Sequence, residues 1–488
     1  MDILICIIPK INPDAPTVGP SLLKSHLMDS GFSCEVLDLN IKLFNELKKN
    51  NEQDFFFAKD SIFLQANKEY FEESLYKKYE YLFLDWVEQI KQKNPKFLGM
   101  SLLSHYSHLF ALTLSKLVKK NLSDIKIVWG GPEVSGQLGD MEEYKKNKLI
   151  DHYISGDGEQ AIIDLLSNNL SAPGIDLNLP VQLDLSAIKI PNYNDINWDE
   201  YEGDFPNTIY ITGSRGCVKK CTFCDVAALW PKYYFRTGES ITKEIIHLEK
   251  KYNRKTFYFT DSLINGSLPA FNNLLKTLRD HKFSNPDSEI QWVSQWIIRS
   301  RLQMPEENFK LLSESGCKEL QIGVESFSEN VRNHMGKKFS DIDLLYCLQM
   351  LHKYKIRSAL LMFVGYPTET EEDHQKSLAM ISKLNDLGYF AANAIDKDGW
   401  RLLDLEIGNP FFLDKNMPIW SMVKEGLITN YKSGLEWECK ENTFPVRVRR
   451  LHEINNLVKS FTGLERSWLT TKRLEQLDIM VKKNYSDL

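Results

Sequence analysis

Short apolar runs alternate with helix-like segments along most of this 488-residue chain. The first run, Ile3–Ile8, is continuous, as expected of a parallel strand buried on both faces, and a helical pattern over Pro20–Ser30 follows it. Strands that alternate with helices form parallel sheets covered by helices, so the sequence predicts an α/β protein. A chain of this length is expected to hold about three domains.

Residues 1–170 are predicted to form a Rossmann-like domain with a doubly wound parallel sheet. Its strands are expected at Ile3–Ile8, Ser33–Leu37, Phe97–Leu102, Lys126–Trp129 and His152–Ser155. The aromatic and charged stretch Asn51–Val87 is predicted to form helices on the surface of this domain. Residues 171–203 lack periodicity and contain three prolines, which is typical of a linker.

Residues 204–389 repeat the strand–helix unit. Strands are expected at Thr208–Thr212, Thr256–Thr260, Ile290–Ser294, Glu319–Val324 and Arg357–Val364, with a sixth at Tyr389–Ile395. These units are expected to form a curved parallel sheet, whose strand count falls short of the eight of a closed barrel. Residues 390–488 are expected to form a small C-terminal domain, which either covers the open mouth of the barrel or packs against its outside.

Three cysteines, Cys217, Cys221 and Cys224, follow the first barrel strand in a C-x3-C-x2-C spacing. Three thiolates this close suit an iron–sulfur cluster, and a 4Fe–4S cluster held by three cysteines keeps one iron open to substrate. A zinc site, or three unrelated cysteines, is the alternative. The other five cysteines are too sparse for a disulfide framework, which favours a reducing compartment.

Charge and hydropathy exclude some functions. A net charge of −6 gives no electrostatic reason to expect a nucleic-acid partner. The N-terminus lacks the pattern of a signal peptide, and the sequence has no apolar run of membrane-spanning length. The sequence therefore predicts a cytoplasmic protein without a membrane or nucleic-acid partner.

The cysteine motif, with Phe223 before its third cysteine, resembles the signature of the radical SAM superfamily. The resemblance implies a partial (βα)6 barrel and a cluster whose open iron binds S-adenosylmethionine (SAM). One electron then cleaves SAM to methionine and a 5′-deoxyadenosyl radical. The electron would come from a donor such as flavodoxin or ferredoxin.

The ends of the later barrel strands also fit the family. They imply SAM-binding roles for Asp261, Ser294, Glu325 in GVES and Gly365 in GYPTET, and Arg236 loosely fits a family segment after the cysteine loop. Helix N-terminal capping is an alternative role for Asp261 and Glu325. No catalytic residue is assigned.

Ser101-x-Leu103 and Gly130-Gly131, which end two strands of the first domain, resemble the cobalamin-binding Rossmann-like domain of one radical SAM subgroup. The resemblance implies that these four residues bind cobalamin. The usual D-x-H-x-x-G motif is missing, because His105 and His108 have no aspartate two residues before them. A Rossmann-like domain that binds no corrin is the alternative.

The resemblance implies an enzyme that methylates an unactivated carbon with cobalamin. One alternative is a radical rearrangement, cyclisation or dehydrogenation without methyl transfer, and another is an iron–sulfur electron carrier or sensor. A methylthiotransferase is disfavoured, because its second cluster needs more N-terminal cysteines than Cys6 and Cys34. The substrate, a small molecule or a peptide, is not identified by the sequence.

Overall fold

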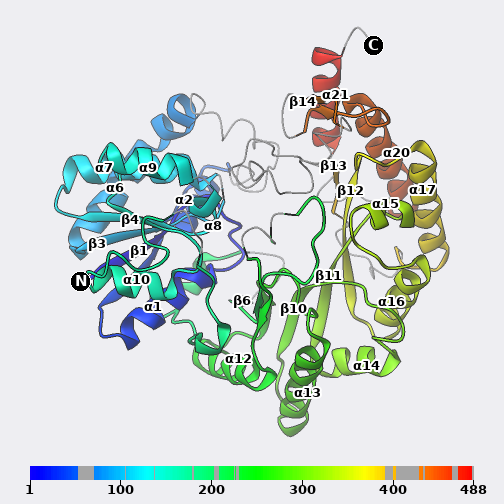
Figure 1. Ribbon diagram of the computed structural model, residues 1–488, viewed down its shortest axis with the longest axis horizontal. Helices are drawn as coiled ribbons and strands as arrows, with labels where there is room; N and C mark the ends of the chain where they lie inside the picture. The colour runs from blue at the N-terminus through cyan, green and yellow to red at the C-terminus, as the bar shows by residue number, and fades with distance from the viewer. Residues whose placement is uncertain are drawn as a thin grey trace. The chain divides into compact units, whose positions relative to one another are not determined.

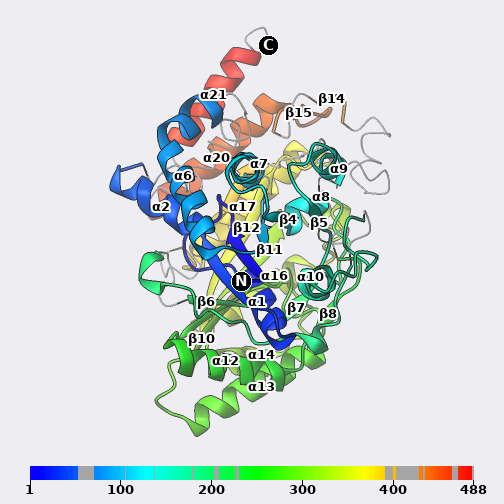
Figure 2. The same ribbon diagram turned by 90° about the vertical axis from the view of Figure 1, so that its left-hand side faces the viewer.

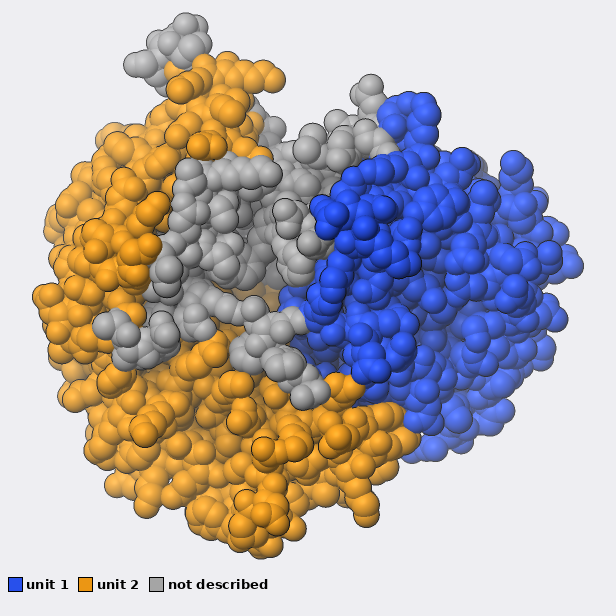
Figure 3. All heavy atoms as spheres, turned by 180° about the vertical axis from the view of Figure 1, so that it is seen from behind, with its two compact units in different colours: residues 1–211 blue, residues 212–488 orange. Residues whose placement is uncertain are grey.

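A computed structural model of the chain shows the predicted α/β elements (Figure 1; Figure 2). It describes residues 1–52, 71–104, 106–136, 138–177, 181–202, 208–224, 226, 230–390, 399–402, 428–431, 435–463 and 471–485. The chain divides into two compact units, Met1–Ile211 and Thr212–Leu488 (Figure 3). The predicted first domain and linker both lie within the first unit.

The first unit contains a five-stranded parallel sheet in the order β2-β1-β3-β4-β5. Its strands are β1 (Ile3–Ile7), β2 (Cys34–Asp38), β3 (Phe97–Ser101), β4 (Lys126–Gly130) and β5 (His152–Ile154). The order reverses between β1 and β3, and open α/β sheets bind ligands at the carboxyl ends of the strands beside such a switch point. This confirms the predicted Rossmann-like sheet.

Helices cover both faces of this sheet. Buried side chains of α1 (Val18–Asp29) and α10 (Gly158–Leu166) form one core with alternate residues of β1. On the other face, α2 (Leu39–Lys49), α6 (Lys77–Lys93) and α7 (Ser107–Asn121) form the larger core. Two short helices, α8 (Pro132–Gly136) and α9 (Leu138–Lys146), follow β4.

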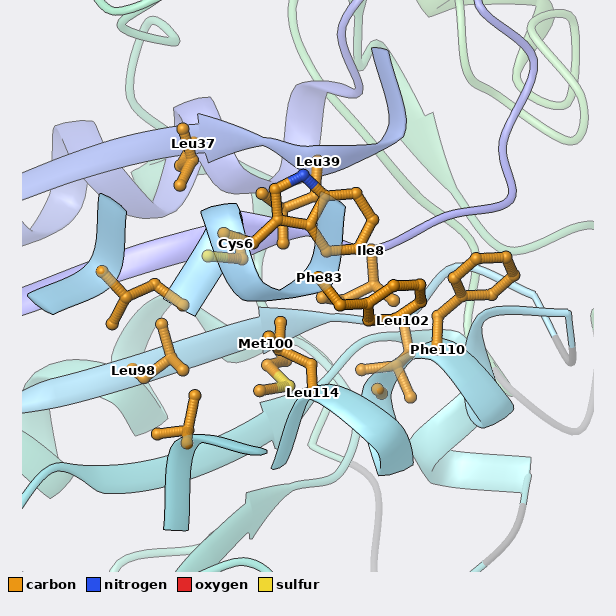
Figure 4. Close-up of a cluster of buried hydrophobic side chains, with 14 of the residues drawn as sticks. Cys6, Ile8, Leu37, Leu39, Phe83, Leu98, Met100, Leu102, Phe110 and Leu114 are labelled. Atoms are coloured by element: carbon orange, nitrogen blue, oxygen red, sulfur yellow. The ribbon is translucent and has the colours of Figure 1, made fainter. Parts of the chain in front are cut away.

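The described part of Asn51–Val87 is helical from Phe71, as predicted, and one face of it is buried. Phe71, in the π-helical turn η2 (Phe71–Tyr76), and Tyr79, Phe83 and Trp86 of α6 are each at most 3% exposed. Phe83 lies among the strand residues Cys6 and Met100 in Figure 4. The aromatic residues recur at helical spacing on one face of α6, so this face packs on the sheet. Residues 53–70 lie outside the described part.

The barrel sheet has the order β6-β9-β10-β11-β12-β13. Its strands are β6 (Thr208–Ile211), β9 (Thr256–Phe259), β10 (Gln291–Trp296), β11 (Cys317–Glu325), β12 (Arg357–Val364) and β13 (Gly399–Leu402). The pairs from β9 to β13 are all parallel, and the first five strands lie where the sequence predicts them. The sixth differs, because Tyr389 and Phe390 are not in a strand and residues 391–398 lie outside the described part.

Each of the strands from β9 to β12 is followed by a helix on the outer side of the sheet (Figure 1). These are α13 (Leu268–Ser284), α14 (Glu306–Glu314), α16 (Asp341–Lys353), which the short α15 (Glu329–His334) precedes, and α17 (Glu371–Asp386). The helix α12 (Gly238–Tyr252) follows the cysteine loop and packs beside α13 (Figure 2).

The C-terminal segment belongs to the same compact unit as the barrel. It contains the small antiparallel pair β14 (Asn430–Tyr431) and β15 (Trp437–Glu438), then α20 (Phe444–Thr462) and α21 (Thr471–Asn484). The helix α20 packs against α17 and against β12 and β13. Whether this segment also covers the open mouth of the barrel stays a prediction, because residues 391–398 and 403–427 lie outside the described part. None of the described helices has the length and apolarity needed to cross a membrane.

Candidate functional site

Buried side chains hold the start of the cysteine loop on both sides. The amide of Gly213 donates to Asp261 Oδ2 at 2.9 Å, and the carbonyl of Gly213 accepts from the amide of Arg236 at 2.9 Å. The Arg236 guanidinium donates to the carbonyl of Thr212 at 2.9 Å and pairs with Glu244 at 2.6 Å. The chain therefore leaves β6 along a fixed path before it reaches the cysteines.

Asp261 is 1% exposed and binds the loop backbone. It does not cap a helix, because Ser267 is the N-cap of α13. Its contact with SAM stays a prediction. Burial raises the pKa of Asp261 to about 6, although hydrogen bonds from Ser214 and Gly213 and the charge of Arg236 oppose this rise.

The raised pKa of Asp261 predicts a pH-dependent stability. The unfolded chain has an ordinary carboxyl pKa of about 3.9, so the folded protein binds this proton more tightly. The resulting stabilisation, about 3 kcal/mol, is complete below about pH 4 and is lost as the pH rises through 6. Asp261→Asn is expected to flatten the dependence of the unfolding free energy on pH across this interval. Asp287→Asn, at an exposed carboxylate, is the control, and parallel pH profiles for wild type and Asp261→Asn would contradict the prediction.

The three cysteines lie half-buried on one loop, and none is in a disulfide. The amide of Cys224 donates to the carbonyl of Cys221 at 3.1 Å, and the amide of Lys219 donates to Cys217 Sγ at 3.4 Å. Burial raises the pKa of the Cys221 thiol, while the nearby Lys337 ammonium opposes the rise. A cation beside a thiol favours the thiolate, which is the form that ligates iron.

Lys337 forms a buried ion pair with Glu325 beside the cysteines. Its Nζ lies 2.9 Å from Glu325 Oε1 and donates to the carbonyl of Gly323 at 2.8 Å, and each side chain of the ion pair is 11% exposed. The ammonium also lies 5.8 Å from the centre of the Phe223 ring. Burial lowers the pKa of Lys337, but the charges of Glu325 and Cys221 outweigh it and raise the pKa overall. Lys337 is therefore a fixed cation, and sequence reasoning missed it because no local pattern marks it.

Glu325 has a left-handed backbone, with φ of +68°, where the register of β11 and β12 shifts. This conformation is uncommon for a residue other than glycine and is found at functional sites. Glu325 is not a helix cap either, because Ser328 is the N-cap of the next helix. Its predicted contact with SAM remains untested, and the ion pair with Lys337 places a carboxylate and an ammonium together.

A second cation, Arg299, lies after β10. Its guanidinium donates to the carbonyls of Asn265 at 2.7 Å and Gly266 at 2.9 Å. Burial lowers the pKa of Arg299, and interactions with Tyr233 and Cys217 oppose this. Positive charges thus lie near both ends of the cysteine motif, which fits a thiolate-ligated cluster.

Ser294 does not lie with the charged residues around the cysteine loop. Alternate side chains of a strand point to opposite faces, so Ser294 shares a face with Trp292 and Trp296. Both tryptophans pack on Phe271 of α13. Ser294 is fully buried, and its hydroxyl donates only to the neighbouring carbonyl of Gln295 at 3.3 Å. The side chain of Ser294 therefore faces the layer of helices. This orientation does not support the predicted contact of Ser294 with SAM.

Gly365 has φ of +90°, and a side chain there would meet Arg447 of α20. A Cβ built on Gly365 would lie 2.1 Å from Arg447 Cδ. The close approach that this glycine permits is therefore to the C-terminal segment. Its predicted contact with SAM stays a prediction.

In the first unit, the predicted cobalamin-binding residues lie together. Ser101 and Gly130 are paired at the carboxyl ends of β3 and β4, and Leu103 is 45% exposed just beyond. Gly131 has φ of +109°, and a Cβ there would lie 2.3 Å from the carbonyl oxygen of Leu102. This glycine packs against the chain's own backbone. Gly130, in contrast, has no atom closer than 3.8 Å to a built Cβ, and Leu103 is exposed beyond the carboxyl end of β3. Their contact with cobalamin is a prediction.

Of the two histidines after the SxL motif, the described residues place neither at the carboxyl ends of β3 and β4. His108 lies on α7, where its Nε2 is 2.7 Å from the Tyr144 hydroxyl and its ring packs on Trp129. Burial lowers the pKa of His108, which favours the neutral ring. His105 lies outside the described residues.

Comparison with known proteins supports the motifs. Residues 211–381 match the family model of the Radical SAM superfamily. An uncharacterized methyltransferase, PH0819 of Pyrococcus horikoshii, is 23% identical over 353 residues, which cover 68% of this chain and 74% of that protein. The ribosomal protein uS12 methylthiotransferase RimO of Clostridium botulinum is 28% identical over 195 residues, which cover 38% of this chain and 42% of RimO.

Two solved structures share the fold. TsrM, a radical S-adenosylmethionine methyltransferase of Kitasatospora setae, has a TM-score of 0.63 at 18% identity, covering 87% of this chain and 76% of TsrM. OxsB, a cobalamin-dependent S-adenosylmethionine radical enzyme, has a TM-score of 0.65 at 14% identity, covering 99% of this chain and 71% of OxsB. The predicted fold class is confirmed. Residues 211–381 of the chain therefore form a radical SAM domain.

Proposed function

We propose that the protein is a cobalamin-dependent radical SAM enzyme that methylates an unactivated carbon. The observation that carries the SAM-cleaving part is the buried ion pair of Glu325 and Lys337 beside the cysteine loop. The fold shared with TsrM and OxsB over most of the chain, together with Ser101 and Gly130 at the sheet edge, supports the cobalamin part.

The ion pair suits the amino-acid end of SAM, which carries one ammonium and one carboxylate. Glu325 can accept from the ammonium of SAM, and Lys337 can donate to its carboxylate. The ion pair and the amino-acid end of SAM are each neutral overall, so the net charge of the site does not change when SAM binds. Both protein charges are buried, and charged hydrogen bonds are stronger away from water. This arrangement also explains why two buried ions are kept in the barrel, since a buried pair alone contributes little to stability.

Cys217, Cys221 and Cys224 would hold a 4Fe–4S cluster, which when bound supplies the electron that cleaves SAM. Cobalamin, when bound at the carboxyl edge of β3 and β4, supplies a carrier for the methyl group. The chain's own residues orient these groups: Asp261 and Arg236 fix the cysteine loop, and Glu325 and Lys337 bind the methionine end of SAM. The electron would come from a partner such as flavodoxin or ferredoxin.

A radical reaction without methyl transfer is the second candidate, because the cysteine loop and the ion pair serve both. The similarity to RimO raises methylthiotransferase activity as well. Cys6 and Cys34, the only cysteines of the first unit, argue against a second cluster there. Both lie buried in adjacent strands of the sheet, and burial raises the pKa of Cys34 to about 12.

The test uses the full-length protein, reconstituted anaerobically with iron and sulfide and then with hydroxocobalamin. About four irons per chain, a reduced-cluster electron paramagnetic resonance (EPR) spectrum that SAM perturbs, and a retained corrin absorption band are expected. Protein that holds no cluster would overturn the radical SAM assignment. A cluster that responds to SAM without any retained corrin would overturn the cobalamin part and favour the second candidate.

A further inference from the structure

The cysteine loop is tied to the GYPTET turn by one hydrogen bond between side chains. The hydroxyls of Thr222 and Tyr366 lie 2.7 Å apart, and either can be the donor. Thr222 stands between Cys221 and Cys224, and its amide donates to the carbonyl of Met335 at 3.2 Å. The Tyr366 residue is buried, its contact with Thr222 is partly buried, and its hydroxyl also lies 3.4 Å from the carbonyl of His334.

The backbone of Tyr366 is itself held by buried polar groups. Glu369 Oε2 accepts from the amides of Gly365 at 2.6 Å and Tyr366 at 3.2 Å. The Asn442 amide group donates to the carbonyls of Tyr366 at 3.1 Å and Glu369 at 2.8 Å. The turn is thus fixed from within and from the C-terminal segment.

Arg450 of α20 completes this support. Its guanidinium donates to Asn442 Oδ1 at 2.6 Å, and the side chain is 1% exposed. Asn442 and Arg450 lie beyond residue 381, where the match to the superfamily model ends. A continuous series of hydrogen bonds therefore runs from α20, through the turn, to the residue between two cysteines.

We infer that Tyr366 is a positioning residue for the iron–sulfur cluster, and that Asn442 and Arg450 of the C-terminal segment hold it in place. The inference rests on the proposed cluster site. Loss of the phenol hydroxyl leaves the Thr222 side chain free to turn, so the loop that carries Cys221 and Cys224 is held by one bond fewer. The aromatic ring packs at 6.5 Å from Phe363, and this contact needs no hydroxyl.

The test compares cluster retention in variants that remove single hydroxyls. Tyr366→Phe and Thr222→Val each break the same bond, and each is expected to lose iron to a chelator about fivefold faster than wild type, the factor that one net hydrogen bond supplies. The EPR spectrum of the reduced cluster is expected to shift in both. Asn442→Ala is expected to change both quantities in the same direction.

Two variants serve as controls. Thr222→Ser keeps the hydroxyl at this position and is expected to retain iron as wild type does. Tyr258→Phe removes a half-buried phenol that donates to Gln321 at 2.6 Å elsewhere in the barrel, and should also match wild type.

The double variant Tyr366→Phe/Thr222→Val should lose iron no faster than Tyr366→Phe, because that single variant already breaks the bond to Thr222 together with the longer contact to the carbonyl of His334. Wild-type iron loss and spectra in both single variants, or additive effects in the double variant, would overturn the inference. These results are separate from failure of the proposed function, in which wild type itself holds no cluster.

Discussion

Lys337→Met is expected to weaken SAM binding about 10- to 100-fold. The substitution removes the donor proposed for the SAM carboxylate and leaves Glu325 buried without its partner at 2.9 Å. Losing one hydrogen bond to a charged group costs about 1.5–3 kcal/mol. The variant keeps all three cysteines, so it is expected to take up a cluster whose EPR spectrum no longer changes when SAM is added.

The matched control is Lys338→Met, which removes the neighbouring, exposed lysine. Its SAM affinity, measured by calorimetric titration of the reconstituted protein, should equal that of wild type. Equal affinities in wild type and Lys337→Met would contradict the role proposed for the ion pair. An equal loss in both lysine variants would mean that charge near the loop matters and that the buried contact does not.

Gly365→Ala is expected to lower the free energy of unfolding of the second unit by about 3 kcal/mol. A left-handed backbone costs an ordinary residue about 1–2 kcal/mol, and an extra methyl group in a packed core costs about 1–3 kcal/mol. Here the methyl group would lie 2.1 Å from Arg447 Cδ. Arg447 cannot easily move, because it donates to the carbonyls of Leu435 and Trp437 and lies 4.0 Å from the Trp437 ring.

Gly388→Ala separates the two costs. Gly388 also has a positive φ, of +78°, but a Cβ there would meet nothing within 4 Å. This variant should lose only the backbone part, about 1–2 kcal/mol. Urea unfolding of both variants measures the difference. A Gly365→Ala protein that is no less stable than Gly388→Ala would show that Arg447 does not pack against Gly365 as described.

The arrangement of the strands could be predicted because each is a short apolar run between helical segments. Arg357–Val364 was predicted with its observed bounds. The buried face of α6 was not predicted, because its aromatic residues are mixed with charges, and the packed fold shows that Tyr79, Phe83 and Trp86 share this face.

The contacts that complete the site could not be predicted, because they join residues far apart in sequence. Thr222 and Tyr366 are 144 positions apart, and Gly365 meets Arg447 only because α20 packs on the edge of the barrel. Lys337 stands in a short turn without a motif, 12 positions after its partner Glu325. The motif predicts a SAM contact for Gly365, which stays a prediction, and the structure shows that Arg447 is the side chain nearest to it.

We propose that the three cysteines hold a cluster that cleaves SAM. The most direct measurement is the amount of 5′-deoxyadenosine that the reconstituted protein forms from SAM with dithionite under anaerobic conditions. Wild type is expected to form it, and Cys217→Ala, Cys221→Ala and Cys224→Ala are each expected to form none above background. Cys347→Ala, at a buried cysteine of α16, should retain the activity. Formation of 5′-deoxyadenosine by all three variants of the motif, or its absence with wild type, would contradict the account.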